Sequence, residues 1–127
     1  MNAVATRTWE RTWPAEAAHV ADARRGVARF ARGFGAGELA LHHIRLAVSE
    51  ACANAIMHAG GTFTVSAARA GDALEVRVRD HGGGMAPRSD SPGAGLGLGI
   101  IRQLACAVEV RTPADGPGTE VRMTFAL

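Results

Sequence analysis

The sequence predicts an α/β fold, specifically an α+β two-layer sandwich in which helices cover one face of a mixed, mostly antiparallel sheet. Three observations lead to this prediction. Five short stretches alternate apolar and polar residues, three longer stretches repeat at helical spacing, and glycine- or proline-rich turns separate them. Their order is β-α-α-β-β-α-β-β, without internal repeats, so residues 1–127 are expected to form a single domain.

The first two elements are a strand and a helix. Residues 6–13 alternate with Trp9 and Trp13 on one parity, which predicts a strand at the edge of the sheet. Pro14 is typical of the first turn of a helix, so the first helix is expected from there to about Arg32. Its apolar residues recur at helical spacing, at Val20, Ala23, Val27, Phe30 and Phe34.

The second helix is predicted from Glu38 to His58 and carries two unusual polar side chains. Glu50 and Asn54 are one turn apart and therefore lie on the same face. Because most of their neighbours are small or apolar, we expect both to be buried and to need a charged ligand. The core stripe of this helix is Leu41, Ile44, Val48, Ala51 and Ala55, about 120° away.

A β-hairpin follows the second helix. Residues 63–67 alternate as a strand, Gly71-Asp72 is a hairpin-type turn, and residues 74–80 form the next strand. Asp80 falls on the apolar parity of that strand. An acid directed to the buried side of a sheet is the second anomaly of the chain.

The C-terminal half begins with a glycine-rich stretch over residues 81–95. Seven of the 16 glycines lie between Gly82 and Gly99. A helix is predicted from about Gly97 to Cys106, then a short strand at residues 108–110 and a turn at 113–118. The last strand buries Val121, Met123 and Phe125, and Thr119 shares their parity.

Composition narrows the class of protein. A net charge of +2 is too small to indicate nucleic-acid binding. No apolar run is long enough to span a membrane and no signal peptide is evident, so a cytoplasmic protein is expected. Cys52 and Cys106 lie in apolar helical patterns and are predicted to be buried, reduced thiols.

All 14 basic residues are arginine, and the absence of lysine excludes several mechanisms. A Walker A phosphate loop, the protein-kinase fold and Schiff-base chemistry each need a lysine. The five histidines are scattered without metal-ligand spacing. Arg24, Arg25, Arg29 and Arg32 form either a solvated helix face or a surface for an acidic partner.

The remaining polar groups suit a nucleotide. Glycine-rich segments that flank a helix start offer free N–H groups to phosphate. Asp80 can accept a hydrogen bond from an exocyclic amine, Asn54 offers an oxygen to Mg²⁺, and Glu50 can act as a general base. A dinucleotide fingerprint does not fit, because Ile100 stands where its third glycine would be.

These motifs resemble the Bergerat ATP-binding fold of the gyrase, chaperone, histidine-kinase and MutL (GHKL) superfamily. The matching boxes are Glu50…Asn54, Asp80-x-Gly82-x-Gly84, Gly95-x-Gly97-x-Gly99 and the pair Gly118-Thr119. Within the superfamily, Val48-Ser49-Glu50-Ala51 followed by Asn54-Ala55-Ile56-x-His58 looks most like bacterial anti-sigma factor serine kinases of the RsbW type.

The resemblance implies roles for these residues. Asp80, supported by Thr119 and Gly84, would bind the adenine amine, Asn54 would ligate Mg²⁺, and Glu50 would activate a serine hydroxyl. The segment from Gly95 to Gly99 would hold the phosphates, with Arg88 or Arg102 adding charge. The full set expected to bind ATP is Asn54, His58, Asp80, Gly82, Gly84, Met85, Gly95, Leu96, Gly97, Leu98, Gly99 and Thr119.

The function implied is that of an ATP-binding anti-sigma factor with serine kinase activity. It would transfer the γ-phosphate to a serine of an anti-anti-sigma factor and sequester a sigma factor, and the resemblance suggests a homodimer. Two alternatives are an ATP-binding interaction module with little or no kinase activity and a detached histidine-kinase catalytic domain. Glu50 favours catalysis, since histidine kinases usually lack a glutamate there, as the resemblance implies.

Overall fold

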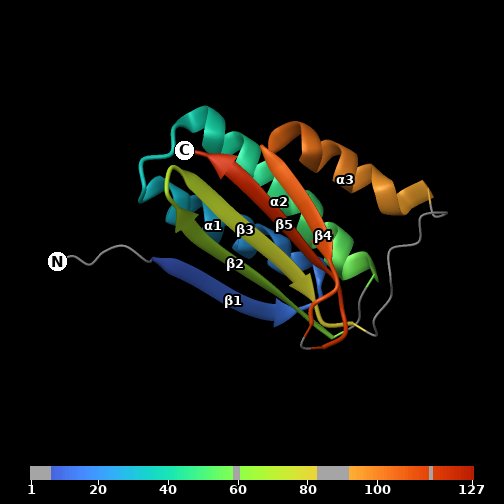
Figure 1. The fold of residues 1–127 in the computed structure, drawn as a ribbon. Helices are drawn as coiled ribbons and strands as arrows, with labels where there is room; N and C mark the ends of the chain where they lie inside the picture. The colour runs from blue at the N-terminus through green and yellow to red at the C-terminus, as the bar shows by residue number, and fades with distance from the viewer. Residues whose placement is uncertain (1–6, 59–60, 83–91, 115) are drawn as a thin grey trace.

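The described part of the chain folds into two layers, a five-stranded sheet and three α-helices that pack on one of its faces (Figure 1). The computed structural model describes residues 7–58, 61–82, 92–114 and 116–127, with the backbone alone at residues 58 and 92–97. The strand order is β1-β2-β3-β5-β4, and every neighbouring pair is antiparallel. The predicted two-layer fold is confirmed, although the sheet is antiparallel throughout rather than mixed.

Strand β1 (Thr8–Pro14) forms one edge of the sheet, as predicted. The expected helix start at Pro14 is wrong, because Pro14 pairs with Thr62 as the last residue of β1. An edge strand tolerates proline, since one side of its backbone needs no sheet partner. The chain then forms a 3-10 turn, η1 (Ala17–His19), before helix α1 (Val20–Arg32) begins.

Helix α2 (Glu38–His58) has the predicted bounds, and all five residues of its predicted core stripe are buried. Helix α1 buries a slightly different stripe from the one expected. Ala23 and Val27 are buried as predicted, but Val20, Phe30 and Phe34 are half-buried. The small side chains of Ala28 and Ala31 are buried instead, as close packing between α1 and α2 allows.

Strands β2 (Thr62–Ala70) and β3 (Ala73–Asp80) form the predicted hairpin around Gly71-Asp72. Their side chains alternate between buried and more exposed positions over Thr62–Ala68 of β2 and along the whole of β3, because only one face of the sheet meets the helices. The side chain of Asp80 belongs to the buried set.

Helix α3 (Pro92–Leu104) begins about five residues earlier than predicted. The helix was expected to begin at about Gly97, with Gly95 in the loop before it, but Gly95 lies inside α3 together with Gly97 and Gly99. Proline is favoured at the first helical position, and glycine only weakens a helix by about 1 kcal/mol per residue, so Pro92 can start the helix despite them. Strands β4 (Ala107–Arg111) and β5 (Glu120–Ala126) complete the sheet.

The face of the sheet away from the helices carries a network of charges. The guanidinium of Arg122 lies 2.6 Å from the Glu109 carboxylate and 3.4 Å from that of Glu75, which also pairs with Arg77 at 2.8 Å. These ion pairs connect β3, β5 and β4. They explain why this face can remain uncovered by a further layer.

The two cysteines differ in their surroundings. Cys52 is buried as predicted, and desolvation raises the pKa of its thiol to about 12. Cys106 is exposed, contrary to the prediction, because α3 ends at Leu104 and the chain has already turned towards β4. Among the helices that the structure describes, none is both long and apolar enough to cross a membrane.

Candidate functional site

Asp80 is the one charged or polar side chain that is buried in the described part of the chain. Its Oδ1 accepts hydrogen bonds from the backbone N–H groups of Gly82 and Thr119, both at 3.2 Å. The backbone N–H of Asp80 in turn donates to the Thr119 carbonyl at 2.9 Å. The carboxylate is therefore held in one orientation, and the predicted association of Asp80 with Thr119 is present.

Gly118 allows the chain to pass very close to Asp80. Its φ is +115°, a backbone conformation that side chains disfavour. A Cβ atom at this position would collide with the Asp80 carbonyl oxygen and lie 3.2 Å from Oδ1. Only glycine therefore fits here. The structure explains the sequence pair Gly118-Thr119: Gly118 lets the backbone pass close to Asp80, and the N–H of Thr119 binds the Asp80 carboxylate.

His81 and Thr64 hold the segment that follows Asp80, a role that the sequence did not indicate. The backbone N–H of His81 donates to the Thr62 carbonyl at 3.2 Å, and the imidazole Nε2 of His81 lies 2.8 Å from the Thr64 Oγ1. This pairing anchors the chain where it leaves β3. In the sequence, Thr64 is only a polar residue on the open face of β2. Such residues are common there, so nothing marked its contact with His81.

Glu50 and Asn54 are half-buried rather than buried, which corrects the expectation from the sequence. The face of α2 beside them is open, since Ala53 is exposed and the Leu46 and Met57 side chains are 43% and 69% exposed. The sequence misled because small and apolar residues on all sides of a helix usually indicate full burial. The Glu50 carboxylate is thus accessible from solution.

The site elements meet at one end of the molecule. Helix α2 packs on β3, β5 and α3. Figure 1 shows the C-terminal ends of α2 and β3 and the beginning of β5 at the same end, with α3 beginning on that side. This arrangement brings the half of α2 that carries Glu50 and Asn54 to the end of the sheet that carries Asp80.

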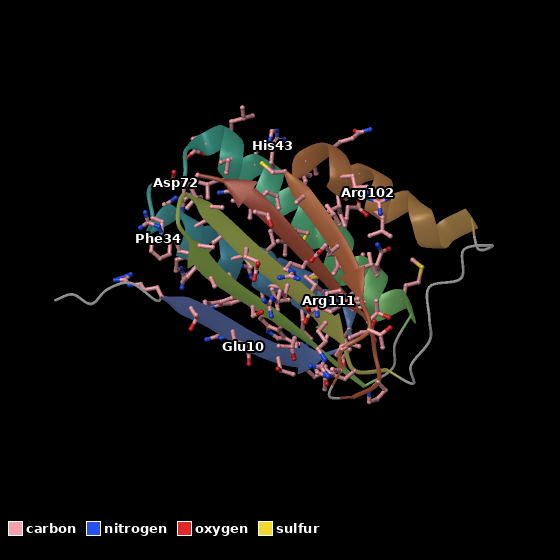
Figure 2. The ribbon with its side chains drawn as sticks, in the orientation of Figure 1. Glu10, Phe34, His43, Asp72, Arg102 and Arg111 are labelled. Carbon is pink, nitrogen blue, oxygen red and sulfur yellow. The ribbon has the colours of Figure 1, made fainter. Side chains whose placement is uncertain are left out.

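The other predicted site residues lie in or near α3. Leu98 is half-buried and packs on the core, Gly99 is exposed, and Arg102 is exposed on the same helix (Figure 2). Gly95, Leu96 and Gly97 lie in the first turns of α3. The predictions for Gly84, Met85 and Arg88 fall outside the described residues, as does the side chain of His58, the last residue of α2.

Comparison with known proteins identifies the family of the chain. The model of the family described as "Histidine kinase-like ATPase domain" matches residues 13–125, nearly the whole chain. The chain belongs to this family. As a histidine kinase-like ATPase domain it is expected to bind ATP, and the GHKL resemblance seen in the sequence is confirmed.

A solved structure shares the fold of this histidine kinase-like ATPase domain. It is the crystal structure of the RsbU and RsbW domains of Rv1364c from Mycobacterium tuberculosis, at 21% identity and a TM-score of 0.74. The match covers 95% of this chain but 32% of the other, so the chain spans about a third of that protein's length. No curated protein matches the chain.

The residues present fit the Mg²⁺ that the sequence resemblance implies. Mg²⁺ usually takes only one or two oxygen ligands from the protein and completes its shell with water and phosphate oxygens. The half-buried amide of Asn54 offers one such oxygen on the open side of α2. Within residues 7–58, 61–82, 92–114 and 116–127, no group of three or more His, Cys, Asp or Glu could hold a metal alone.

Proposed function

We propose that this chain is an ATP-dependent serine kinase of the anti-sigma type. It binds ATP with Mg²⁺ at the Asp80 and Asn54 end of the fold and transfers the γ-phosphate to a serine of an anti-anti-sigma protein. It also sequesters a sigma factor. The observation that carries the proposal is the Glu50 carboxylate, accessible on the open face of α2 and one turn from Asn54.

Asp80 supplies the specificity for adenine. Its Oδ1 is occupied by two backbone N–H groups, which leaves Oδ2 to accept a hydrogen bond from the exocyclic amine of the base. Guanine presents a carbonyl oxygen where adenine has this amine, and two acceptors facing each other repel. The pocket is therefore selective for adenine, while Gly118 and Thr119 keep the carboxylate in place.

The phosphates are held without lysine. The first turn of α3, which begins at Pro92, offers its free N–H groups and the positive end of the helix dipole to the phosphates, and the absence of side chains at Gly95, Gly97 and Gly99 lets them approach the helix. The exposed guanidinium of Arg102 lies in the last turn of the same helix, about 15 Å along the axis from Pro92, so it adds only a distant positive charge. When bound, Mg²⁺ neutralises part of the triphosphate charge, and Asn54 would be its ligand from the protein.

Glu50 acts as the general base. The serine hydroxyl of the partner donates its proton to the Glu50 carboxylate as its oxygen forms a bond to the γ-phosphorus. The bond between that phosphorus and the β–γ bridging oxygen breaks, and ADP leaves with the electron pair. A base that serves a protein substrate must be reachable from solution, which agrees with the half-buried position of Glu50 on an open helix face.

The anti-sigma assignment has separate support. The similar solved structure contains a domain named RsbW, and the motif around Glu50 resembles that group of kinases. The sigma factor, the anti-anti-sigma protein and the homodimer remain predictions.

A phosphorylation assay tests the proposal. The chain is incubated with Mg²⁺, γ-labelled ATP and a panel of anti-anti-sigma proteins from the same genome, and a parallel sample receives EDTA. We expect acid-stable phosphoserine on one panel member, and none with EDTA. Tight ATP binding without any labelling would favour the non-catalytic interaction module. Acid-labile phosphate on histidine would favour a histidine-kinase domain.

A further inference from the structure

Large apolar side chains are exposed along one line of helix α2. Five large apolar residues are exposed in the described part of the chain, and three of them belong to this helix: Leu39 at 70%, Leu46 at 43% and Met57 at 69%. Ala53, between the last two, is exposed as well. We call Leu39, Leu46, Ala53 and Met57 the apolar stripe of α2.

The apolar stripe lies on a single face. At about 100° per residue, its four members point within about 40° of one another, although they span about 27 Å along the helix. Glu50 falls between them in sequence and lies beside the same face. Leu46 and Ala53 are four and three residues from Glu50, which places their Cβ atoms about 5–6 Å from it.

The position of Glu50 determines what must cover the apolar stripe. A serine hydroxyl has to come within about 3 Å of the Glu50 carboxylate to lose its proton. A serine presented to Glu50 on this open side of α2 brings its neighbouring residues next to Leu46 and Ala53, and Met57 lies about two turns beyond Glu50 on the same face. Exposed apolar side chains that lie together on one face indicate a surface that a partner covers. The substrate protein is such a partner.

The border of the stripe towards α1 is basic. Arg24 on α1 is half-buried, and its Nη1 lies 3.4 Å from the Oγ of Ser49, the residue before Glu50. Arg25 is exposed next to it and pairs with Asp22 at 2.7 Å. Acidic side chains on the partner would therefore be complementary on this side.

We propose that the apolar stripe of α2 is the docking surface for the protein segment that carries the acceptor serine. This segment presents apolar side chains next to its serine and acidic side chains towards α1. The inference rests on the proposed kinase function and adds the surface by which the kinase selects its substrate. It assigns Leu46 and Met57 to substrate binding, with no role in nucleotide binding or in the chemical step.

The test compares two variants with the parent chain. The double variant Leu46→Ser with Met57→Ser removes the two large apolar side chains of the stripe that are nearest to Glu50 in sequence. Leu127→Ser is the control, since Leu127 is 37% exposed but lies beyond β5. Circular dichroism verifies that both variants are folded. The probe is each protein of the anti-anti-sigma panel, with affinity measured by biolayer interferometry and phosphorylation by labelled ATP.

The stripe variant should bind its panel partner at least about tenfold more weakly, equivalent to about 1.4 kcal/mol. KM for the partner should rise accordingly, while KM for ATP, kcat at saturating partner and the control variant stay unchanged. Partner affinity equal to that of the parent chain would overturn the docking proposal but leave the kinase intact. Stripe-dependent binding without phosphorylation would support docking and contradict the kinase. Absence of binding to every panel member would overturn both.

Discussion

Replacement of Gly118 by alanine is the sharpest test of how the proposed adenine site around Asp80 is built. The new Cβ would collide with the Asp80 carbonyl oxygen and approach the carbonyl carbon to 3.1 Å. Both neighbours belong to the backbone of β3 and cannot rotate away as a flexible side chain could. The strands must therefore separate locally, and Asp80 must move from the position in which Thr119 holds it.

The magnitude follows from two contributions. Placing alanine at φ +115° costs about 1–2 kcal/mol, and displacing packed backbone adds about 1–3 kcal/mol. We therefore expect Gly118→Ala to lose about 2–5 kcal/mol of unfolding free energy. Gly35→Ala is the matched control, because Gly35 has φ +88° but its Cβ would meet nothing within 4 Å, so only about 1–2 kcal/mol should be lost.

Urea denaturation measures the stability of both variants, and calorimetric titration measures their affinity for ATP. Movement of the Asp80 carboxylate should weaken its hydrogen bond to adenine, lowering ATP affinity by about tenfold or more in Gly118→Ala and not in Gly35→Ala. Equal stability loss in the two variants, together with unchanged ATP affinity, would refute the role given to Gly118.

Three further predictions concern specificity, the thiols and the basic border. Asp80→Ala should abolish the preference for ATP over GTP in calorimetric titrations, and a retained preference would disprove adenine recognition by this carboxylate. Iodoacetamide at pH 8 should add one label to the native chain, at exposed Cys106. Cys52 should react only in denaturant, because burial raises its pKa to about 12 and excludes the reagent; two adducts on the native chain by mass spectrometry would contradict this. Replacing Arg24 and Arg25 with alanine should weaken partner binding about three- to tenfold and reduce its dependence on salt, whereas unchanged affinity would reject a basic docking border.

Much of the fold is encoded in local patterns. The bounds of α2 could be predicted because its core stripe repeats over about four turns and glycines flank the helix on both sides. The hairpin of β2 and β3 was equally clear from strict alternation around Gly71-Asp72. The same alternation identified Asp80 as a buried acid before any contact was known, since a strand leaves no choice of face once its register is set.

Other features depend on contacts that the sequence does not reveal. Pro14 could begin a helix or end an edge strand, and pairing with Thr62 decides between them. The start of α3 at Pro92 was obscured by glycines, because the glycine-rich run up to Gly95 was expected to form a loop. The exposure of Glu50 was mispredicted because alanine-rich surroundings are compatible both with burial and with a surface that a partner covers.

The central claim is that Glu50 makes this ATP-binding domain a kinase. Its most direct test is the single-turnover rate of phosphate transfer to the panel partner, compared between the parent chain and Glu50→Gln at saturating ATP. Removal of the base should lower this rate by about 10²–10⁴-fold while ATP affinity stays within about twofold, because the carboxylate takes a proton and does not hold the nucleotide. An undiminished rate in Glu50→Gln would contradict the proposed mechanism.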